Sequence, residues 1–317
     1  MLQWGFGGGS GFAFRPVEVD SSITSQNKDA MTAVNTPTQQ NTVNRIADFY
    51  RDATSDYRIW SKHMNMHFGY WKPGMCAFRR ERMLQKMNDV VVTECCQDKS
   101  GGTYLDLGCG VGATVKYAMT KFPNNNFKGF TISPHQTNWA RYNYGGNFPI
   151  YCKDYNKLEI PDKSADGAWF LESLCHAENK ESAIKEVARV LKPGARLIIC
   201  DGMRRRPCRK MSFLGRKLYR VVCNHWAVPD FPDRNLLILT AQRSGFKLIR
   251  NQDWSIRIGF SALHAPWLSL RELIKARLGL RVANEAQLSN LKASMAALFL
   301  GCCRRDFRYG HIVLEKV

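Results

Sequence analysis

The sequence predicts an α/β fold with a doubly wound, mostly parallel sheet, and two observations lead to that prediction. From residue 101 to residue 203, short apolar runs alternate with longer stretches whose apolar residues recur at helical spacing. Glycine and proline mark the ends of several of these segments, as at Gly108 and at Lys192–Gly194. Strands that alternate with long helices form a parallel sheet, which has helices on both faces.

The elements of this alternation follow one another with short connections. We expect strands at Thr103–Leu107, Phe127–Ile132, Pro149–Cys152, Asp166–Leu171 and Arg196–Asp201, and helices at Ala113–Lys121, Pro134–Tyr144 and Asn179–Leu191. A last segment, Tyr309–Glu315, alternates weakly between apolar and polar residues. We expect this segment to pair antiparallel at or near the edge of the sheet.

The segments around the alternation are expected to complete a single domain. Apolar residues at helical spacing predict helices beginning near Asn41 and across Phe78–Cys96. Large apolar residues interrupt the alternation after the fifth strand, where an insertion would roof the ligand-binding ends of the strands. The predicted parts are a flexible tail (1–40) and one domain (41–317). The domain begins with N-terminal helices (41–100) and a core (101–203). A helical cap and substrate region, interleaved with late core elements (204–306), and a final strand (307–317) complete it.

The composition narrows the class of protein. With 44% hydrophobic and 23% charged residues among 317, the chain can bury a sizeable core and is not of a disordered type. Its 11 cysteines are odd in number and include no Cys-x-x-Cys pair, so we expect reduced thiols in a cytoplasmic protein and no metal site. Neither a membrane-spanning apolar run nor a secretory signal is recognisable.

The net charge of +19 is spread unevenly along the chain. Between residues 204 and 220 the sequence has no acid and eight basic residues: Arg204, Arg205, Arg206, Arg209, Lys210, Arg216, Lys217 and Arg220. This basic block suits an anionic partner, such as a phosphorylated substrate, an anionic membrane or a nucleic acid. The simpler interpretation is a solvated surface on a basic protein.

A glycine-rich turn carries the strongest chemical signal. It reads Leu-Asp-Leu-Gly-Cys-Gly-Val-Gly over residues 105–112, between a predicted strand and a predicted helix. Gly108, Gly110 and Gly112 let the backbone turn tightly and approach a ligand closely. The spacing differs from that of a dinucleotide fingerprint, and Asp106 would repel a pyrophosphate but suits a cationic amino-acid head group.

With the motifs that follow it, this turn resembles the first motif of the class I S-adenosylmethionine (SAM)-dependent methyltransferases. The resemblance covers about residues 49–317 and implies a Rossmann-like methyltransferase fold with SAM as cofactor. It further implies that Asp106 and the three glycines hold the cofactor. Asp154 looks like the acid that, with its neighbour Tyr155, contacts the adenine.

Two features point to one branch of that family. The second predicted strand is followed by Ser-Pro-His-Gln at residues 133–136 rather than by an acid, and His-Phe-Gly-Tyr-Trp occupies residues 67–71. Both are similar to the branch of cyclopropane fatty acid synthases and of sterol, tocopherol and isoprenoid methyltransferases. The resemblance implies cofactor contacts from Ser133, Gln136 and Trp71, and places Tyr70 near the sulfonium, where an aromatic face stabilises a cation. The alternative is that these rings only pack the N-terminal helices on the core.

A second motif of the same branch supplies the predicted catalytic groups. Residues 171–176, Leu-Glu-Ser-Leu-Cys-His, resemble its Glu-x-x-x-His segment. On an alkene acceptor, Glu172 or His176 would remove a proton after methylation, while Tyr70 and other rings stabilise the cation. The simpler interpretation is that Glu172 only makes a hydrogen bond to backbone or cofactor and that His176 is structural.

The predicted function is therefore SAM-dependent methylation of a small lipophilic acceptor, with C-methylation of an isoprenoid or sterol-like alkene as the leading hypothesis. The alternative is O- or N-methylation of a small natural-product-type metabolite, and cyclopropanation stays open. An acceptor diphosphate would give the basic block a role, and peripheral contact with an anionic membrane is the other use of it. A nucleic-acid partner is not expected, because no RNA-binding module is recognisable.

Overall fold

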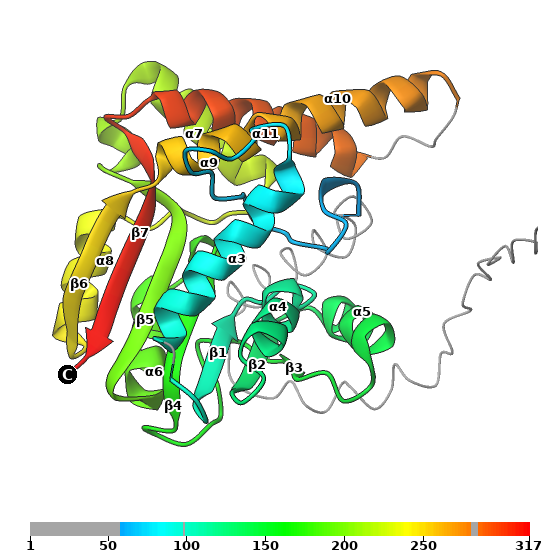
Figure 1. The fold of residues 1–317 in the computed structure, drawn as a ribbon. Coiled ribbons are helices and arrows are strands. Elements are labelled where there is room, and N and C mark those ends of the chain that lie inside the picture. The colour runs from blue at the N-terminus through cyan, green and yellow to red at the C-terminus, as the bar shows by residue number, and fades with distance from the viewer. Residues whose placement is uncertain (1–57, 98, 280–284) are drawn as a thin grey trace, which may run out of the picture.

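The structure is a computed structural model that describes residues 58–97, 99–279 and 285–317. The tail predicted at 1–40 and the helix predicted from Asn41 lie outside the described residues. Figure 1 shows a central sheet with helices on both sides and a helical layer at the top of the view. This arrangement confirms the predicted α/β architecture with a cap.

The sheet has seven strands in the order β3-β2-β1-β4-β5-β7-β6. Their bounds are β1 Thr103–Leu107, β2 Asn126–Thr131, β3 Ile150–Cys152, β4 Ala165–Leu171, β5 Leu191–Arg204, β6 Phe246–Asp253 and β7 Phe307–Lys316. Strands β1 to β5 pair in parallel, whereas β7 pairs antiparallel with both β5 and β6. The predicted C-terminal strand thus lies one place in from the edge, and the predicted mostly parallel sheet is confirmed.

Two hydrophobic clusters bury the two faces of this sheet. Tyr104 and Trp169 point to the face covered by α3 (Arg80–Cys96), α4 (Ala113–Lys121) and α5 (Pro134–Tyr144). Leu105 and Phe170, one residue further along β1 and β4, point to the face covered by α6 (Lys180–Val190) and α8 (Arg234–Arg243). Adjacent strand residues point to opposite faces, so apolar runs without alternation are what a sheet buried on both sides requires.

The cap consists of helices inserted after β5 and after β6. Helix α7 (Phe213–His225) follows β5, and α9 (Ser255–Ala262), α10 (His264–Arg277) and α11 (Glu285–Cys302) lie between β6 and β7. A third hydrophobic cluster joins α7 to α11 through Tyr219, Val222 and Leu300. The cap is therefore packed around its own small core above the sheet (Figure 1).

Two details of the sheet differ from the sequence prediction. Lys192–Gly194, expected as a turn, belongs to β5, which begins directly after α6 and carries a bulge where its pairing with β4 shifts register. Strand β6 had no predicted counterpart. Most of its side chains are exposed, so it has neither a buried apolar run nor a regular alternation to reveal it.

Candidate functional site

The glycine-rich turn joins β1 to α4 and leaves no room for a side chain at its three glycines. Gly108, Gly110 and Gly112 have φ angles of +84°, +57° and +82°, a region that glycine enters without strain. A Cβ on Gly108 would lie 2.4 Å from Cβ of Ser173, and one on Gly112 would lie 2.6 Å from the ring of Phe148. The three glycines therefore let the backbone turn tightly against its neighbours, in a loop that can cradle a ligand.

Asp106, on β1 just before this turn, is buried. Its Oδ2 atom makes no hydrogen bond to the described part of the chain. Burial raises the pKa of Asp106 to about 8, against a smaller opposing effect of Trp169. A buried carboxyl oxygen without a partner is costly. A ligand ammonium group at this place would supply the partner and lower the pKa again, so the residues present fit an amino-acid-bearing cofactor.

Ser133 and Gln136 lie against the same turn. The Oγ of Ser133 caps α5 by accepting a hydrogen bond from the backbone N–H of Gln136, at 3.4 Å. Thr131 donates to Oε1 of Gln136 at 2.6 Å, which directs its Nε2 toward Sδ of Met66, 3.6 Å away. That sulfur would lie 2.7 Å from a Cβ on Gly110. The two predicted cofactor residues are thus held at the turn, and their contact with the cofactor stays a prediction.

Asp154 and Tyr155 follow β3, the strand beyond β2. Oδ1 of Asp154 accepts hydrogen bonds from the backbone N–H and the side-chain amide of Asn156, at 2.8 and 2.7 Å. The hydroxyl of Tyr155 donates to the carbonyl of Ser173 at 3.0 Å, and its buried ring packs edge-on against Phe170. Asp154 is half-exposed and accessible to a ligand, whereas Tyr155 supports the turn from the core.

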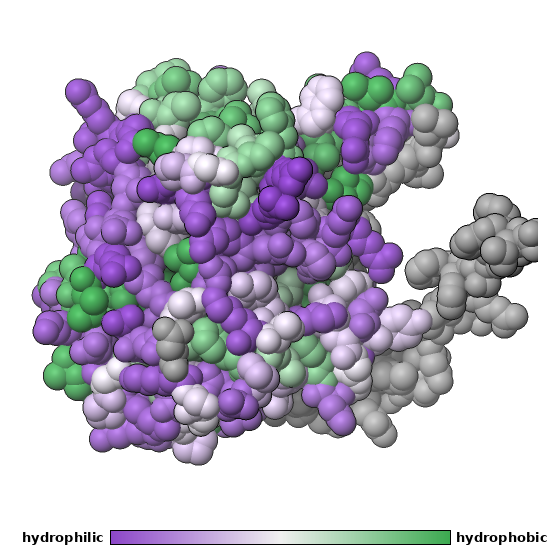
Figure 2. All heavy atoms as spheres, in the orientation of Figure 1, coloured by the Kyte–Doolittle hydropathy of each residue, from purple (hydrophilic) through white to green (hydrophobic). Residues whose placement is uncertain are grey.

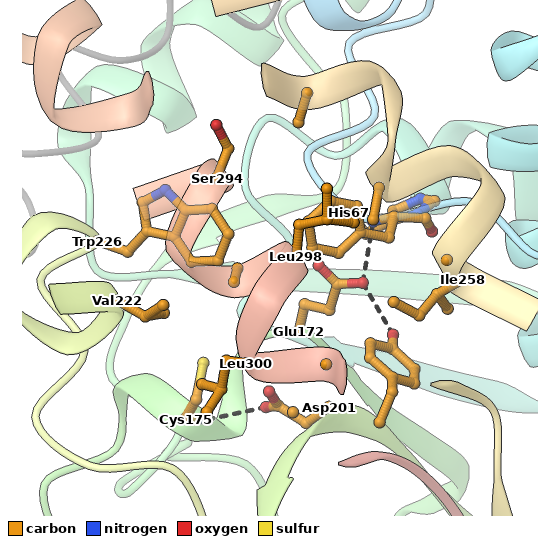
Figure 3. A pocket seen from close by; sticks show the side chains of 18 of the residues that line it. His67, Glu172, Cys175, Asp201, Val222, Trp226, Ile258, Ser294, Leu298 and Leu300 are labelled. Carbon is orange, nitrogen blue, oxygen red and sulfur yellow. Dashed lines mark hydrogen bonds between the residues drawn. The ribbon is translucent and has the colours of Figure 1, made fainter. Parts of the chain in front are cut away.

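A cavity of about 470 Å³ lies between the end of the sheet and the cap (Figure 3). In Figure 3, Trp226, Ser294 and Leu298 of the cap region face Glu172 and Asp201 of the sheet. The volume suits a small organic ligand. The aromatic residues of its wall are Trp60, Phe68, Trp226, Phe231, Phe307 and Tyr309.

Glu172 is the central polar group of this cavity. It directly follows β4 and has a φ of +53°, a strained angle for a residue with a side chain. Its Oε1 accepts hydrogen bonds from the backbone N–H of Phe68, at 2.9 Å, and from the hydroxyl of Tyr309, at 2.8 Å (Figure 3). Burial raises the pKa of Glu172 to about 8, although both hydrogen bonds favour the charged form. The carboxyl group therefore changes protonation near neutral pH.

Two further titratable groups line the cavity beside Glu172. His176 lies in a short 3₁₀ helix, Leu174–His176, where burial lowers its pKa to about 4 against a hydrogen bond with the backbone of Ala227. Neutral His176 is thus a weaker base than Glu172. Asp201, which was not among the site residues predicted from the sequence, accepts a hydrogen bond from the backbone N–H of Cys175 at 2.9 Å, and burial raises its pKa to about 6. Its position at the end of the predicted fifth strand was the available signal.

Tyr70 and Trp71 do not line this cavity. The ring of Tyr70 packs on Trp254 with centroids 4.6 Å apart, and that of Trp71 packs on Phe260 at 4.3 Å. These contacts attach the segment to α9 and its preceding residue, as the packing interpretation of these rings expects. A place for either ring near the sulfonium stays a prediction.

The basic block does not line the cavity either. Arg204 instead pairs with Asp230 at 3.0 Å and with Asp233 at 3.4 Å. The described part of the cavity wall carries three carboxyl groups, Glu172, Asp201 and Glu272, against the guanidinium of Arg304. The block therefore contributes none of its eight basic side chains to the described wall, where an acceptor diphosphate would have given it a role.

Comparisons with known proteins identify the chain as similar to methyltransferases. A family model described as "Methyltransferase domain" matches residues 105–199. The O-methyltransferase rstn1 of Aspergillus nomiae NRRL is 30% identical over 207 residues, which are 62% of this chain and 87% of that protein. The 24-methylenesterol C-methyltransferase 2 of Arabidopsis thaliana is 24% identical over 225 residues, which are 68% of this chain. The chain spans 61% of the length of that relative.

Solved structures show the same fold. The cyclopropane synthase MmaA2 from Mycobacterium tuberculosis aligns with a TM-score of 0.73 at 14% identity, covering 86% of this chain and 98% of that one. Geranyl diphosphate C-methyltransferase from Streptomyces coelicolor A3(2), in complex with Mg²⁺, geranyl-S-thiolodiphosphate and S-adenosyl-L-homocysteine, aligns with a TM-score of 0.66 at 14% identity, covering 90% and 100%. Within the described residues, no helix is long and apolar enough to cross a bilayer.

Proposed function

The chain belongs to the class I SAM-dependent methyltransferases, in the branch that includes sterol and tocopherol methyltransferases, and we propose that it methylates a carbon of a neutral, lipophilic alkene. One observation carries the proposal. The carboxyl group of Glu172 faces an aromatic-walled cavity, with a pKa raised to about 8. Such a group can stabilise a cation and then accept its proton.

The cofactor site has the required features on the other side of Glu172. When bound, SAM supplies an electrophilic methyl group on a cationic sulfonium. We expect the glycine turn to hold it by backbone contacts and Asp106 to meet its ammonium group, because both places are shaped for a ligand with those properties. Ser133, Gln136 and Asp154 are proposed to complete the contacts.

The acceptor chemistry follows from the cavity wall. An alkene that gains a methyl group at one carbon is left with a cation at the neighbouring carbon. Aromatic faces stabilise such a cation, and Trp226, Phe231 and Tyr309 provide them. Glu172 then takes the proton from the adjacent carbon, which forms the double bond of the product. A base acts best when its pKa lies near the working pH, as that of Glu172 does.

The charge of the cavity favours a neutral acceptor over a diphosphate. Glu272 is paired with Arg271 and Lys275, and the charge of Lys180, outside the wall, partly offsets that of Asp201. Glu172 has no such cation beside it in the described wall and repels an anion as it ionises. The apolar remainder of the wall favours a hydrocarbon body for the acceptor. A sterol-like or isoprenoid alkene without a phosphate has both properties.

The second candidate is O- or N-methylation of a small metabolite. It is supported by the 30% identity to an O-methyltransferase, of which the match covers 87% of the length. Glu172 would then accept the proton of a hydroxyl group or an amine directly, and no cation would form on the acceptor.

Transfer of an isotopically labelled methyl group from SAM separates the two candidates. We would offer sterols, neutral polyprenyl lipids, prenyl diphosphates, unsaturated phospholipids, phenols and amines, and locate the label in the product. A new carbon–carbon bond in a neutral alkene is the expected result. Label on oxygen or nitrogen alone, or transfer to prenyl diphosphates alone, would reject the proposal.

Two variants test the role of Glu172 in that assay. Glu172→Gln keeps an oxygen for the hydrogen bonds of Phe68 and Tyr309 but cannot accept a proton, so turnover should fall by about 10²–10⁴. Cofactor affinity, measured by calorimetry, should stay within about threefold. The matched control is Glu178→Gln, which changes an exposed glutamate nearby. Equal turnover of both variants would leave Glu172 with a structural role.

A further inference from the structure

Helices α10 and α11 of the cap line the cavity with one side and expose large apolar residues on the other. Along α10, the exposed residues Trp267, Leu270 and Ile274 recur at three- and four-residue spacing and so share one face of the helix. Leu268 and Glu272 line the cavity and lie about half a turn away. Leu278, just beyond the helix, is 68% exposed and continues the outer stripe.

Helix α11 repeats this arrangement. Leu288, Met295 and Phe299 are 45%, 40% and 52% exposed and share its outer face. Ser294 and Leu298 of the same helix line the cavity. A helix that is apolar on all sides is normally buried, so an exposed one requires something to cover it. Figure 2 shows hydrophobic residues gathered over the cap at the top of the molecule.

Basic residues surround this outer face. Arg277 of α10 and Lys292 of α11 are exposed beside the two stripes, and Arg271 and Lys275 flank the apolar face of α10. Most of the basic block, including Arg209 and Lys217, is exposed around the start of α7, where Phe213 is 78% exposed. An apolar helix face bordered by lysine and arginine, with a tryptophan in it, is typical of helices that lie in the surface of an anionic membrane.

We propose that the outer faces of α10 and α11 dock on an anionic lipid bilayer, so that a lipophilic acceptor passes from the bilayer into the cavity beneath them. The charge argues for this occupant over a second copy of the chain, because a dimer through this face would bring the basic residues of two chains of net charge +19 together. The route of the acceptor rests on the proposed function, whereas the docking itself does not.

Vesicle flotation of the full chain tests the docking. We expect binding to vesicles of phosphatidylcholine mixed with phosphatidylglycerol, and weaker binding to phosphatidylcholine alone. The double variant Trp267→Ser and Ile274→Ser should bind at least about tenfold more weakly, because it removes most of the apolar area of α10. The double variant Arg277→Gln and Lys292→Gln should also lose about tenfold or more, and only on the anionic vesicles.

The matched control removes exposed apolar residues elsewhere. Leu236→Ser with Leu239→Ser changes two exposed leucines of α8 and should leave vesicle binding unchanged. Circular dichroism and thermal melting check that each variant is folded. Wild-type chain that does not float, or an α10 variant that floats like the α8 control, overturns the proposal. A third outcome also overturns it: light scattering shows that the wild type is an oligomer and the α10 variant a monomer, while both float equally well.

A further comparison distinguishes this proposal from the proposed function. With acceptor dispersed in detergent, the α10 variant should retain wild-type turnover, whereas with acceptor inside vesicles its turnover should fall in parallel with binding. Vesicle binding without turnover on any acceptor would leave the docking surface standing and reject the proposed function. Equal loss of turnover in detergent and in vesicles would reject the delivery route.

Discussion

Replacing Glu172 by Gln should remove a pH dependence from the stability of the fold. The pKa of this carboxyl group rises from 4.5 to about 8 on folding, chiefly because of burial. Between these values the folded state holds a proton that the unfolded state has released, so the stability that the wild type has at low pH is lost as the pH rises. At about 1.4 kcal/mol per pKa unit, the full shift corresponds to about 5 kcal/mol. Glu172 is only half-buried at the cavity wall, and solvent screening there reduces this value, so we expect about 2–4 kcal/mol.

Glu172→Gln isolates this effect, because the amide oxygen can still accept the hydrogen bonds of Phe68 and Tyr309. Urea unfolding followed by tryptophan fluorescence should give equal stabilities for variant and wild type near pH 4.5. As the pH rises, the free energy of unfolding of the variant should increasingly exceed that of the wild type. This difference between the two proteins should level off above about pH 8. The pH dependence contributed by acids that do not interact with Glu172 is common to both proteins and cancels, whereas the charge of Asp201 acts on Glu172 and is a smaller cause of its raised pKa.

Tyr309→Phe is the companion variant. It removes a hydrogen bond that favours the charged form of Glu172, so the pKa of Glu172 should rise further and the stability of the fold should go on falling to a higher pH than in the wild type. Parallel stability curves for wild type and Glu172→Gln across this range would refute the reasoning, because they would mean that Glu172 is ionised in the folded protein at all of these pH values.

Three further changes test the site. Gly108→Ala should destabilise the fold by about 2–5 kcal/mol, because it combines a left-handed φ with a Cβ placed 2.4 Å from Cβ of Ser173. In the control Gly146→Ala the added Cβ meets nothing within 4 Å, so the thermal midpoint should change little. Asp106→Asn should raise stability at about pH 9, because it removes a buried carboxyl with a pKa of about 8, and should weaken SAM binding about tenfold or more in calorimetry; unchanged SAM affinity would contradict its place at the ammonium group. Asp201→Asn should stabilise the protein by about 1–2 kcal/mol above about pH 6 and not below about pH 4, as measured by melting at both pH values, and a loss of stability at high pH would show that its charge is compensated.

The sequence predicted most of the core because its signals are local. The strand bounds of β1 and the bounds of α4 and α5 agree with the prediction, since each follows from a short apolar run, a cap or a proline close to it. The glycine turn could be recognised from single residues, because the positive φ angles that it needs are ones that glycine permits. Its assignment to a SAM cofactor rested on the resemblance of this turn and the motifs after it to a known family. Strand β6 could not be predicted from a local pattern, because most of its side chains are exposed. It is held in the sheet by its pairing with β7, a segment distant in the sequence.

Only the tertiary structure decided how the catalytic candidate is held. Glu172 accepts hydrogen bonds from Phe68, 104 residues before it, and from Tyr309, 137 residues after it. Its raised pKa comes from burial beneath the cap, against the hydrogen bonds that two distant segments provide, so no local pattern could contain it. The same holds for Asp201 and for the place of the basic block outside the cavity. The sequence indicated SAM as the cofactor through motifs that resemble those of a known family, whereas the environment of the acceptor cavity depends on which distant segments the fold brings together.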